Sequence, residues 1–135
     1  MAETIGFSGI TSTNQIKYAC SELRSAWPLI MKNFKQLTGN DLILTCTYRS
    51  PQEQQRLYSI GRTTKGKIIT WVDGVTKKSN HNKVPARAID VAVIAGGKVS
   101  WDPELYLPIG IICKGMGFTW GGFWKVKDYP HIEMA

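Results

Sequence analysis

The only two histidines of the chain, His81 and His131, each lie near carboxylates in the sequence. Asp90 follows His81, and the carboxylates of Asp128 and Glu133 flank His131. Two neutral imidazoles and one carboxylate form a three-ligand zinc site with an open fourth position, the pattern of catalytic rather than structural zinc. The pattern constrains the fold because residues 81, 90 and 131 must meet, and it predicts that His81, Asp90 and His131 bind Zn²⁺.

A catalytic base is predicted three residues before the last of these ligands, at Asp128. Zinc lowers the pKa of a bound water toward ~7. A nearby carboxylate can accept a proton as the water attacks a carbonyl and can then pass it to the leaving amine. Glu133 is the competing candidate, but in a strand it shares a face with His131. We therefore predict that Glu133 orients an imidazole.

Substrate contacts are predicted at Arg49 and, as one of two alternatives, at a group of aromatic residues. Arg49 stands close to a predicted helix start, where a cation is unfavourable for the helix dipole, and this favours a functional role. Its guanidinium could bind a substrate carboxylate or stabilise a developing oxyanion. Three aromatic residues fit either a substrate groove or the core: Trp120, Phe123 and Trp124.

The segment Ala88–Ile94 has the alternation of a half-buried strand. Successive side chains of a strand point to opposite faces, so Ile89, Val91 and Val93 share one face, which we predict to be core. The other face carries Asp90 between two alanines, which leaves room for a metal and a substrate. Aspartate is otherwise depleted in strands, so this placement favours a functional role over a solvated surface position.

The remaining pattern predicts helices alternating with short strands. Ser12 with Gln15 fits a capping box that would begin the first helix, and Gly39 would end it. Ser50 followed by Pro51 is a strong helix start. The predicted helices cover about residues 13–38, 51–60 and 102–116, and the predicted strands about 42–47, 88–94 and 131–134. This order predicts an α+β fold, with a small antiparallel sheet, helices packed to one side and a single zinc site.

Size and charge predict one domain with an anionic partner. At 135 residues the chain is long enough to bury its own core, so residues 1–135 are predicted to be a single domain. The net charge of +7 favours nucleic acid, anionic lipid or a bacterial cell wall. A nucleic-acid-binding protein has no need for two histidines beside carboxylates. We therefore expect no nucleic-acid partner and predict a monomer.

Cysteine usage and hydropathy indicate a protein made in a reducing compartment. Cys20, Cys46 and Cys113 are odd in number and form no CxxC pair, so all three are predicted to be small buried hydrophobic residues. No window approaches the ~18 apolar residues of a membrane span. The first seven residues lack the features of a secretory signal peptide. Synthesis in a cytoplasm is the expectation.

Six short segments form a specific pattern in a fixed order: Tyr48-Arg49-Ser50-Pro51, Gly61-Arg62-Thr63, Ser79-Asn80-His81, Ala88-Ile89-Asp90, Trp120-Gly121-Gly122 and Asp128 to Glu133. Together they make residues 42–135 resemble the superfamily of zinc D-Ala-D-Ala carboxypeptidases and L-alanyl-D-glutamate peptidases. The resemblance is closest to the single-domain phage endolysins. It implies an α+β fold and zinc bound by His81, Asp90 and His131. It also implies an acid/base at Asp128 and a substrate contact at Arg49.

The chain departs from the commonest pattern of that superfamily, SxHxxGxAxD. The connection from His81 to Asp90 is two residues longer, and Ala86 stands where the glycine would be. The extra length falls around Lys83-Val84-Pro85, which we predict to be a loop that absorbs it. Ser79 matches the serine of the pattern.

The resemblance implies a zinc peptidase that hydrolyses bacterial peptidoglycan stem peptides, most simply at the L-Ala–D-Glu bond. Two alternatives remain open: a D,D-carboxypeptidase with the same site, and a non-catalytic, metal-dependent module that binds the cell wall. The presence of Asp128 argues against the binding module. A phage lysin of this kind would wait in the cytoplasm of the host bacterium and act on the wall after release.

Overall fold

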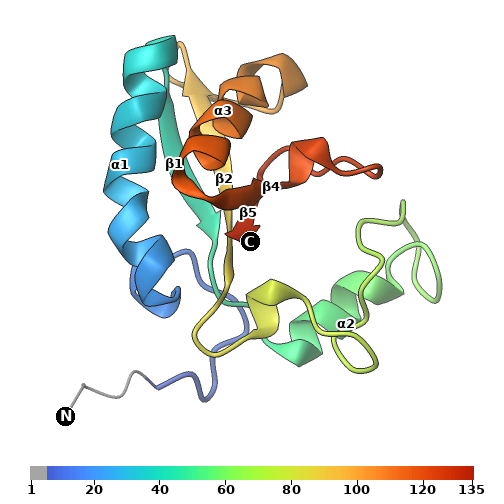
Figure 1. The fold of residues 1–135 in the computed structure, drawn as a ribbon. Coiled ribbons are helices and arrows are strands. Elements are labelled where there is room, and N and C mark those ends of the chain that lie inside the picture. The colour runs from blue at the N-terminus through green and yellow to red at the C-terminus, as the bar shows by residue number, and fades with distance from the viewer. Residues whose placement is uncertain (1–5) are drawn as a thin grey trace.

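The computed structural model describes residues 6–135 and shows an α+β fold, as predicted (Figure 1). Its elements are α1 (Ser21–Thr38), β1 (Asp41–Cys46), α2 (Pro51–Ser59), β2 (Ala88–Ala95), β3 (Lys98–Ser100), α3 (Leu107–Met116), β4 (Phe118–Trp120) and β5 (His131–Met134). Short 3₁₀ turns occur at Ile16–Tyr18, Asn80–Asn82, Pro103–Tyr106 and Gly121–Phe123. Among these residues, no helix is both long enough and apolar enough to cross a membrane.

The strands form one five-stranded antiparallel sheet in the order β1-β2-β5-β4, with β3 paired to β2. On the central strand β2, the predicted core residues Ile89, Val91 and Val93 are fully buried. Buried residues of α1 and α3 pack against this face. The prediction that helices pack to one side of the sheet is confirmed for these two.

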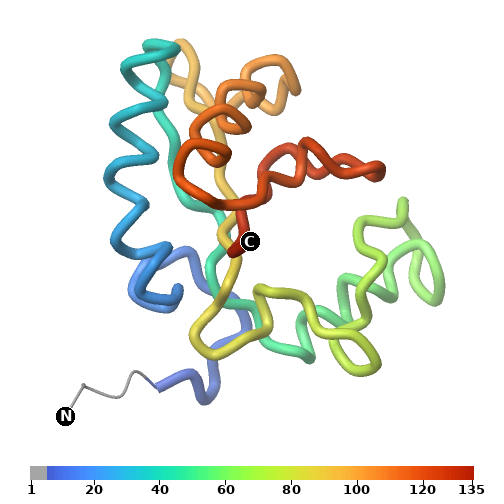
Figure 2. Tube along the Cα trace, viewed as in Figure 1, coloured from blue at the N-terminus to red at the C-terminus, as the bar shows by residue number. Residues whose placement is uncertain are grey.

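Helix α2 is arranged differently from α1 and α3. In Figure 1, α2 lies away from the sheet, and Figure 2 shows that it forms an arm together with the chain that follows it. Ser50 caps α2, because its side chain accepts a hydrogen bond from the backbone N–H of Glu53, and Pro51 occupies the first helical position. The helix start predicted at Ser50 and Pro51 is therefore confirmed.

The predicted start of the first helix is wrong, because α1 begins at Ser21 rather than near residue 13. The backbone of this segment pairs instead with the chain after β1. Thr13 N–H donates to Tyr48 O at 3.0 Å, and Thr47 N–H donates to Thr13 O at 2.7 Å. Backbone groups satisfied by this pairing have no need of helical hydrogen bonds. The capping-box pattern at Ser12 and Gln15 was a local signal that long-range pairing overrides.

A β-bulge in β1 changes which side chains share a sheet face. From Asp41 to Leu44 the register with β2 is regular, and it then shifts so that Cys46 pairs with Asp90. Asp90 in turn pairs with His131 of β5. Side chains of directly paired residues lie on the same face of a sheet. Cys46, Asp90 and His131 therefore form a row across three strands, on the face opposite to the one that α1 and α3 cover.

Candidate metal centre

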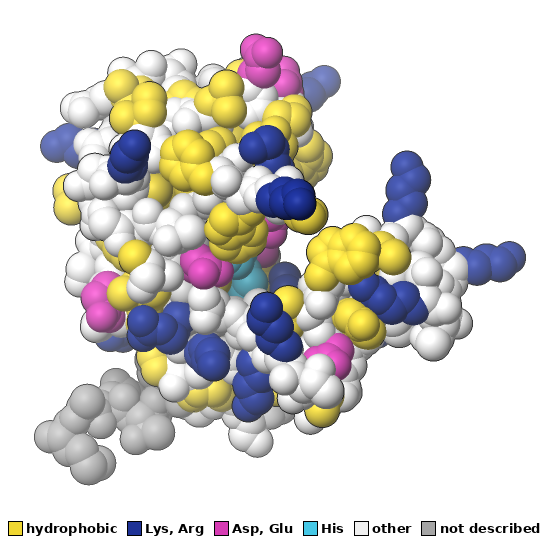
Figure 3. Space-filling model, turned by 45° about the vertical axis from the view of Figure 1, so that its right-hand side comes forward, with side chains coloured by type: hydrophobic (Ala, Val, Ile, Leu, Met, Phe, Trp, Pro, Cys, Tyr) yellow, Lys and Arg dark blue, Asp and Glu magenta, His cyan; other side chains and the backbone are white. Residues whose placement is uncertain are grey.

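His81, Asp90 and His131, the three predicted ligands, meet on that open face. His81 Nε2 lies 3.2 Å from Asp90 Oδ2, and His131 Nδ1 lies 3.1 Å from Asp90 Oδ1. The centroids of the two imidazole rings are 5.1 Å apart. Figure 3 shows histidine at the base of a hollow between the body of the molecule and the arm, beside acidic side chains. The longer connection between the first two ligands does not separate them.

His81 is held by a 3₁₀ turn and by one hydrogen bond of its ring. Ser79 caps the turn: its hydroxyl accepts from His81 N–H, and Asn82 completes the capping box by accepting from Ser79 N–H. His81 Nδ1 lies 2.8 Å from the carbonyl oxygen of Thr47, so Nδ1 carries the proton and donates it. The other nitrogen, Nε2, lies 3.2 Å from Asp90 Oδ2.

His81 Nε2 provides the test of whether this site fits a metal. The side chain is 2% exposed, and among the described residues Nε2 is the buried side-chain nitrogen or oxygen that has no hydrogen-bond partner. An unsatisfied buried polar atom is costly and calls for an explanation. A zinc ion shared with Asp90 and His131 would satisfy it, because neutral imidazole and carboxylate are both zinc ligands. The residues therefore fit the metal.

His131 uses the opposite ring nitrogen. At the start of β5, its Nε2 lies 2.7 Å from Glu133 Oε1 and donates to that carboxylate, which leaves Nδ1 facing Asp90. The predicted role of Glu133, to orient an imidazole, agrees with this contact. A ligating histidine usually gives its second N–H to such an acceptor, which fixes the tautomer and raises the basicity of the ligand.

Replacing Glu133 by Gln is expected to weaken zinc binding by about 10–100-fold, because outer partners of metal ligands have effects of that size. The amide keeps the shape of the side chain but removes the charge that polarises His131. Competition with a chromophoric chelator measures the dissociation constant. The exposed residue Glu104 offers the matched control, Glu104→Gln. Equal zinc affinity in the wild type and Glu133→Gln would contradict this role.

Asp128 lies at the edge of the same cluster. Its Oδ2 is 3.9 Å from His131 Nδ1, and half of its side-chain surface is exposed. Asp128 N–H donates to Gly121 O, and a side chain at Gly121 would overlap the carbonyl oxygen of Asp128. The glycine therefore allows this close approach. Burial and the neighbouring Asp90 carboxylate raise the pKa of Asp128, which suits a group that must accept a proton and then release it.

Arg49 also points into the cluster. Its Nη2 lies 3.6 Å from Asp90 Oδ2, and its Nη1 donates to Gln54 Oε1 at 3.0 Å. Gln54 is 1% exposed, and its amide donates to Thr70 Oγ1 and to Val72 O in the arm. The arm thus fixes the arginine through Gln54. This positioning residue was missed in the sequence, where a glutamine on a short helix carries no distinctive signal.

Cys46 was also missed, because the sequence predicted only a buried hydrophobic residue. It is buried, at 6% exposed, but its Sγ lies 3.6 Å from Arg49 Nη2, and its ligand atom lies within 4.8 Å of those of His81 and Asp90. With regular alternation, Cys46 would share the core face with Leu42 and Leu44. The bulge turns it to the other face, and nothing in the sequence marks that bulge.

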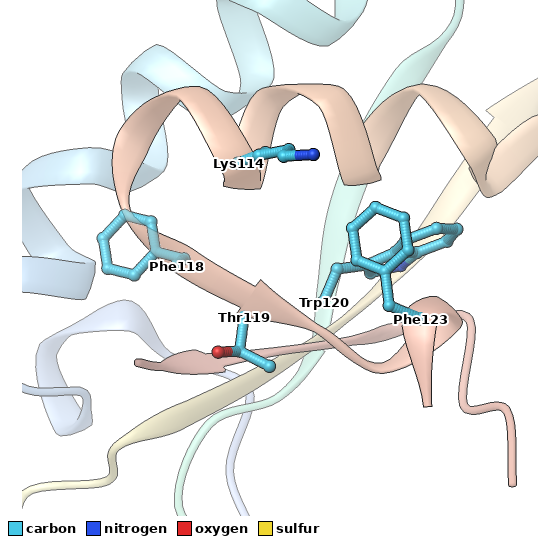
Figure 4. Close-up of a pocket in the computed structure, with 5 residues that line it drawn as sticks. All are labelled: Lys114, Phe118, Thr119, Trp120 and Phe123. Atoms are coloured by element: carbon cyan, nitrogen blue, oxygen red, sulfur yellow. The ribbon is translucent and has the colours of Figure 1, made fainter. Parts of the chain in front are cut away.

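Of the three aromatic residues proposed for a groove or the core, the structure places one in the core. Trp120 is core: it is 2% exposed, and its Nε1 donates to Tyr129 O. Phe123 is 63% exposed, and the Trp124 ring lies 5.0 Å from that of His131. Figure 4 shows a pocket of about 260 Å³ lined by Lys114, Phe118, Thr119, Trp120 and Phe123. No predicted ligand or catalytic residue lines this pocket.

Without a metal, protonated histidines pair with the carboxylate of Asp90. Burial disfavours the charged form of His81, but the Asp90 carboxylate outweighs burial and raises the pKa of His81 to about 10. For the same reasons, with Glu133 contributing, the pKa of His131 rises to about 9. Burial acts against ionisation of Asp90, yet the two imidazoles hold its pKa far below the usual range. A bound cation would take over the role of these protons.

The metal-free protein is therefore expected to lose stability as pH rises above neutrality. In the unfolded chain, imidazole has a pKa of about 6.5, whereas the folded-state values are raised. A raised pKa stabilises the folded state below about pH 6.5, and this contribution is lost as pH rises through about 9 to 10. The Tm of chelator-treated protein, measured by calorimetry, should fall over this range, and zinc should reduce the fall. A Tm that rises or stays level without zinc would contradict this electrostatic account.

Comparisons with known proteins found a similar family and a similar curated protein. Residues 73–134 match the family described as D-alanyl-D-alanine carboxypeptidase. Over 107 residues, the chain is 42% identical to the peptidoglycan L-alanyl-D-glutamate endopeptidase CwlK of Bacillus subtilis (strain 168), covering 71% of this chain and 62% of that protein. The chain thus spans about three fifths of the length of this curated relative.

A solved structure shares the fold. The crystal structure of the Serratia marcescens L-Ala D-Glu endopeptidase ChiX superposes with a TM-score of 0.62, and the match covers 89% of this chain and 83% of that one. The two sequences are 20% identical in this comparison, so the likeness concerns the fold. The α+β architecture with its small antiparallel sheet is thus found in a solved protein.

Proposed function

We propose that this chain, which carries a domain of the D-alanyl-D-alanine carboxypeptidase family, is a zinc peptidase that hydrolyses the stem peptides of bacterial peptidoglycan. One observation carries the proposal: the buried, unpartnered Nε2 of His81 faces the carboxylate of Asp90, whose other oxygen faces His131 Nδ1. This donor set suits zinc and leaves one coordination position for chemistry.

Three residues would bind zinc in the proposed reaction, and a fourth, Asp128, would transfer the proton. When bound by His81, Asp90 and His131, zinc supplies a Lewis acid that polarises a carbonyl and acidifies a water molecule. Asp128 accepts a proton from the attacking water as the new C–O bond forms. It then delivers that proton to the amine nitrogen as the C–N bond breaks, so the side chain ends the cycle as it began.

Arg49 is proposed to stabilise the negative charge that develops on the carbonyl oxygen. Its guanidinium is held by Gln54 at 3.0 Å and already lies beside Asp90. A donor fixed before the reaction stabilises the transition state without the cost of reorganising during it. The alternative role of Arg49 is to bind a carboxylate of the stem peptide, since a guanidinium binds carboxylates with two parallel hydrogen bonds.

The proposed bond is the amide between L-Ala and D-Glu. CwlK, the relative at 42% identity, is named for cleavage at this position. The hollow in Figure 3 is open between the body and the arm, which suits a peptide that continues on both sides of the cleaved bond. The matched family is described as D-alanyl-D-alanine carboxypeptidase, so removal of a terminal D-Ala is the second candidate.

One synthetic substrate distinguishes these reactions. A stem pentapeptide that begins with L-Ala–D-Glu and ends in D-Ala–D-Ala contains both bonds, and mass spectrometry identifies the fragments. We expect release of free L-Ala by the zinc-loaded protein, and none after chelation. Release of D-Ala alone would assign the chain to the carboxypeptidases. An intact peptide with a zinc-loaded, folded protein would favour the non-catalytic wall-binding module.

We further propose that the protein acts as a phage-endolysin-like monomer, on the cell wall of a host in whose cytoplasm it is made. Its net charge of +7 would concentrate it on an anionic wall. Because exposed charges are screened by salt, co-sedimentation with purified peptidoglycan should weaken as ionic strength rises. Sedimentation that does not depend on salt would contradict the electrostatic part of this proposal.

A further inference from the structure

Cys46, which the proposed mechanism does not use, lies in one row with two of the predicted metal ligands. The bulge in β1 pairs Cys46 with Asp90, and Asp90 pairs with His131 on its other side. Regular pairing of β1 with β2 would have placed Thr45 opposite Asp90 and turned Cys46 to the core. A local break in the sheet thus brings a thiol to the metal-binding face.

The distances bring the thiol within reach of the same ion. The ligand atoms of Cys46, His81 and Asp90 all lie within 4.8 Å of one another. Two ligands of one zinc ion can lie at most ~4.4 Å apart, the sum of a Zn–S and a Zn–N bond length. A side-chain adjustment therefore suffices to bring the three groups onto one metal. The partners of the thiol are weak: Tyr48 O and Ser12 Oγ each lie 3.9 Å from Sγ, and Arg49 Nη2 donates to Sγ at 3.6 Å.

The second observation is the orphaned nitrogen of His81. Nε2 is buried without a hydrogen-bond partner and forms one group of neighbouring ligand atoms with Cys46 and Asp90, while His131 and Asp128 form a second such group with Asp90. Because Asp90 belongs to both groups, a single metal bound by His81, Asp90 and His131 would have the thiol of Cys46 beside it. Arg49 Nη2, at 3.6 Å from both Cys46 Sγ and Asp90 Oδ2, is close enough to balance the charge of a bound thiolate.

We propose that Cys46 is the fourth protein ligand of this metal centre, so that the substrate-free site binds a thiophilic divalent cation through His81, Asp90, His131 and Cys46. The inference rests on the metal site of the proposed function. As the S–metal bond forms, the thiol proton is released to water. With four protein ligands no coordination position remains for water, and such a closed set is typical of structural zinc sites. Cys46 must therefore dissociate before hydrolysis.

A thiolate ligand also changes which metals the site prefers. Thiolate favours zinc and other soft ions, whereas a set of oxygen donors favours magnesium, calcium or manganese. Loss of the thiolate is expected to weaken cadmium binding at least about tenfold, since even outer partners of metal ligands contribute about 10–100-fold. Manganese affinity should change much less.

Cobalt(II) reports the ligand directly, because sulfur ligation gives an intense near-ultraviolet charge-transfer band. We expect this band in the substrate-free wild type loaded with cobalt, and its loss in Cys46→Ser with cobalt still bound. The matched control is Cys20→Ser, which removes another buried thiol at the N-cap of α1, where serine is a favourable residue. That variant should keep the band.

The outcomes separate the two proposals. A wild type that binds cobalt without the band, or a band that survives in Cys46→Ser, overturns the ligand role and leaves the peptidase proposal standing. A wild type that binds no metal overturns both. Should Cys46→Ser fail to fold, X-ray absorption of the zinc-loaded wild type decides: a Zn–S distance of about 2.3 Å is expected, and a shell of only nitrogen and oxygen at about 2.0–2.2 Å would overturn the proposal.

Discussion

Replacing Asp128 by Asn is expected to lower kcat by about 10²–10⁴-fold while leaving the zinc content unchanged. General-base catalysis contributes about that factor, and an amide cannot accept the proton that the carboxylate takes. Asp128 is half exposed and lies 3.9 Å from His131, beyond hydrogen-bonding distance, so the substitution should disturb the ligands little. Peptide hydrolysis and elemental analysis of the same preparation measure the two quantities.

The matched control is Asp41→Asn, which changes an exposed aspartate that pairs with Lys35 at 3.3 Å and lies at the opposite end of β1 from Cys46. Its kcat should equal that of the wild type. A fully active Asp128→Asn variant would show that another group is the base. A variant that lost its zinc would show that Asp128 acts as a ligand instead.

Replacing His81 by Ala should remove both zinc and activity. The imidazole is 2% exposed, and its Nδ1 already donates to Thr47 O, so Nε2 is the ring nitrogen left to bind the metal. With zinc at about 100 times its dissociation constant, a bound ion stabilises the wild type by about 2.7 kcal/mol, and this variant would lack that gain. Thermal unfolding with and without zinc measures the difference.

The comparison that matters is the zinc-dependent shift in Tm, because loss of a buried ring lowers stability by itself. The wild type and Asp128→Asn should show this shift, and His81→Ala should not. A His81→Ala protein that still binds zinc with wild-type affinity would contradict the proposed ligand set. Metal binding would then no longer explain why Nε2 of His81 lacks a hydrogen-bond partner in the wild type.

Much of the site was predictable because its chemistry leaves few alternatives. A chain with two histidines has few ways to build a zinc site. An aspartate that shares a strand face with two alanines, in an otherwise apolar strand, limits them further. The antiparallel pairing of β2 with β5 then places Asp90 opposite His131. Strand alternation, which sequence shows directly, was enough to predict which face of β2 carries the carboxylate.

What could not be predicted depends on long-range pairing. The residues before Ser21 match a helical pattern, but their backbone partners lie after β1 and at Ala86, which no local window contains. Cys46 follows the alternation of core residues until a one-residue bulge reverses it, and such a slip changes the face of every side chain beyond it. Gln54 gains its role only from the fold of the arm.

We propose that this protein uses zinc to cut the L-Ala–D-Glu bond of peptidoglycan. Mass spectrometry of the fragments released from purified peptidoglycan tests it most directly, with zinc in one sample and a chelator in the other. We expect new L-Ala carboxyl ends and D-Glu amino ends in the zinc sample alone. Such ends in equal amount in both samples, or in neither, would contradict the proposed zinc-dependent cleavage.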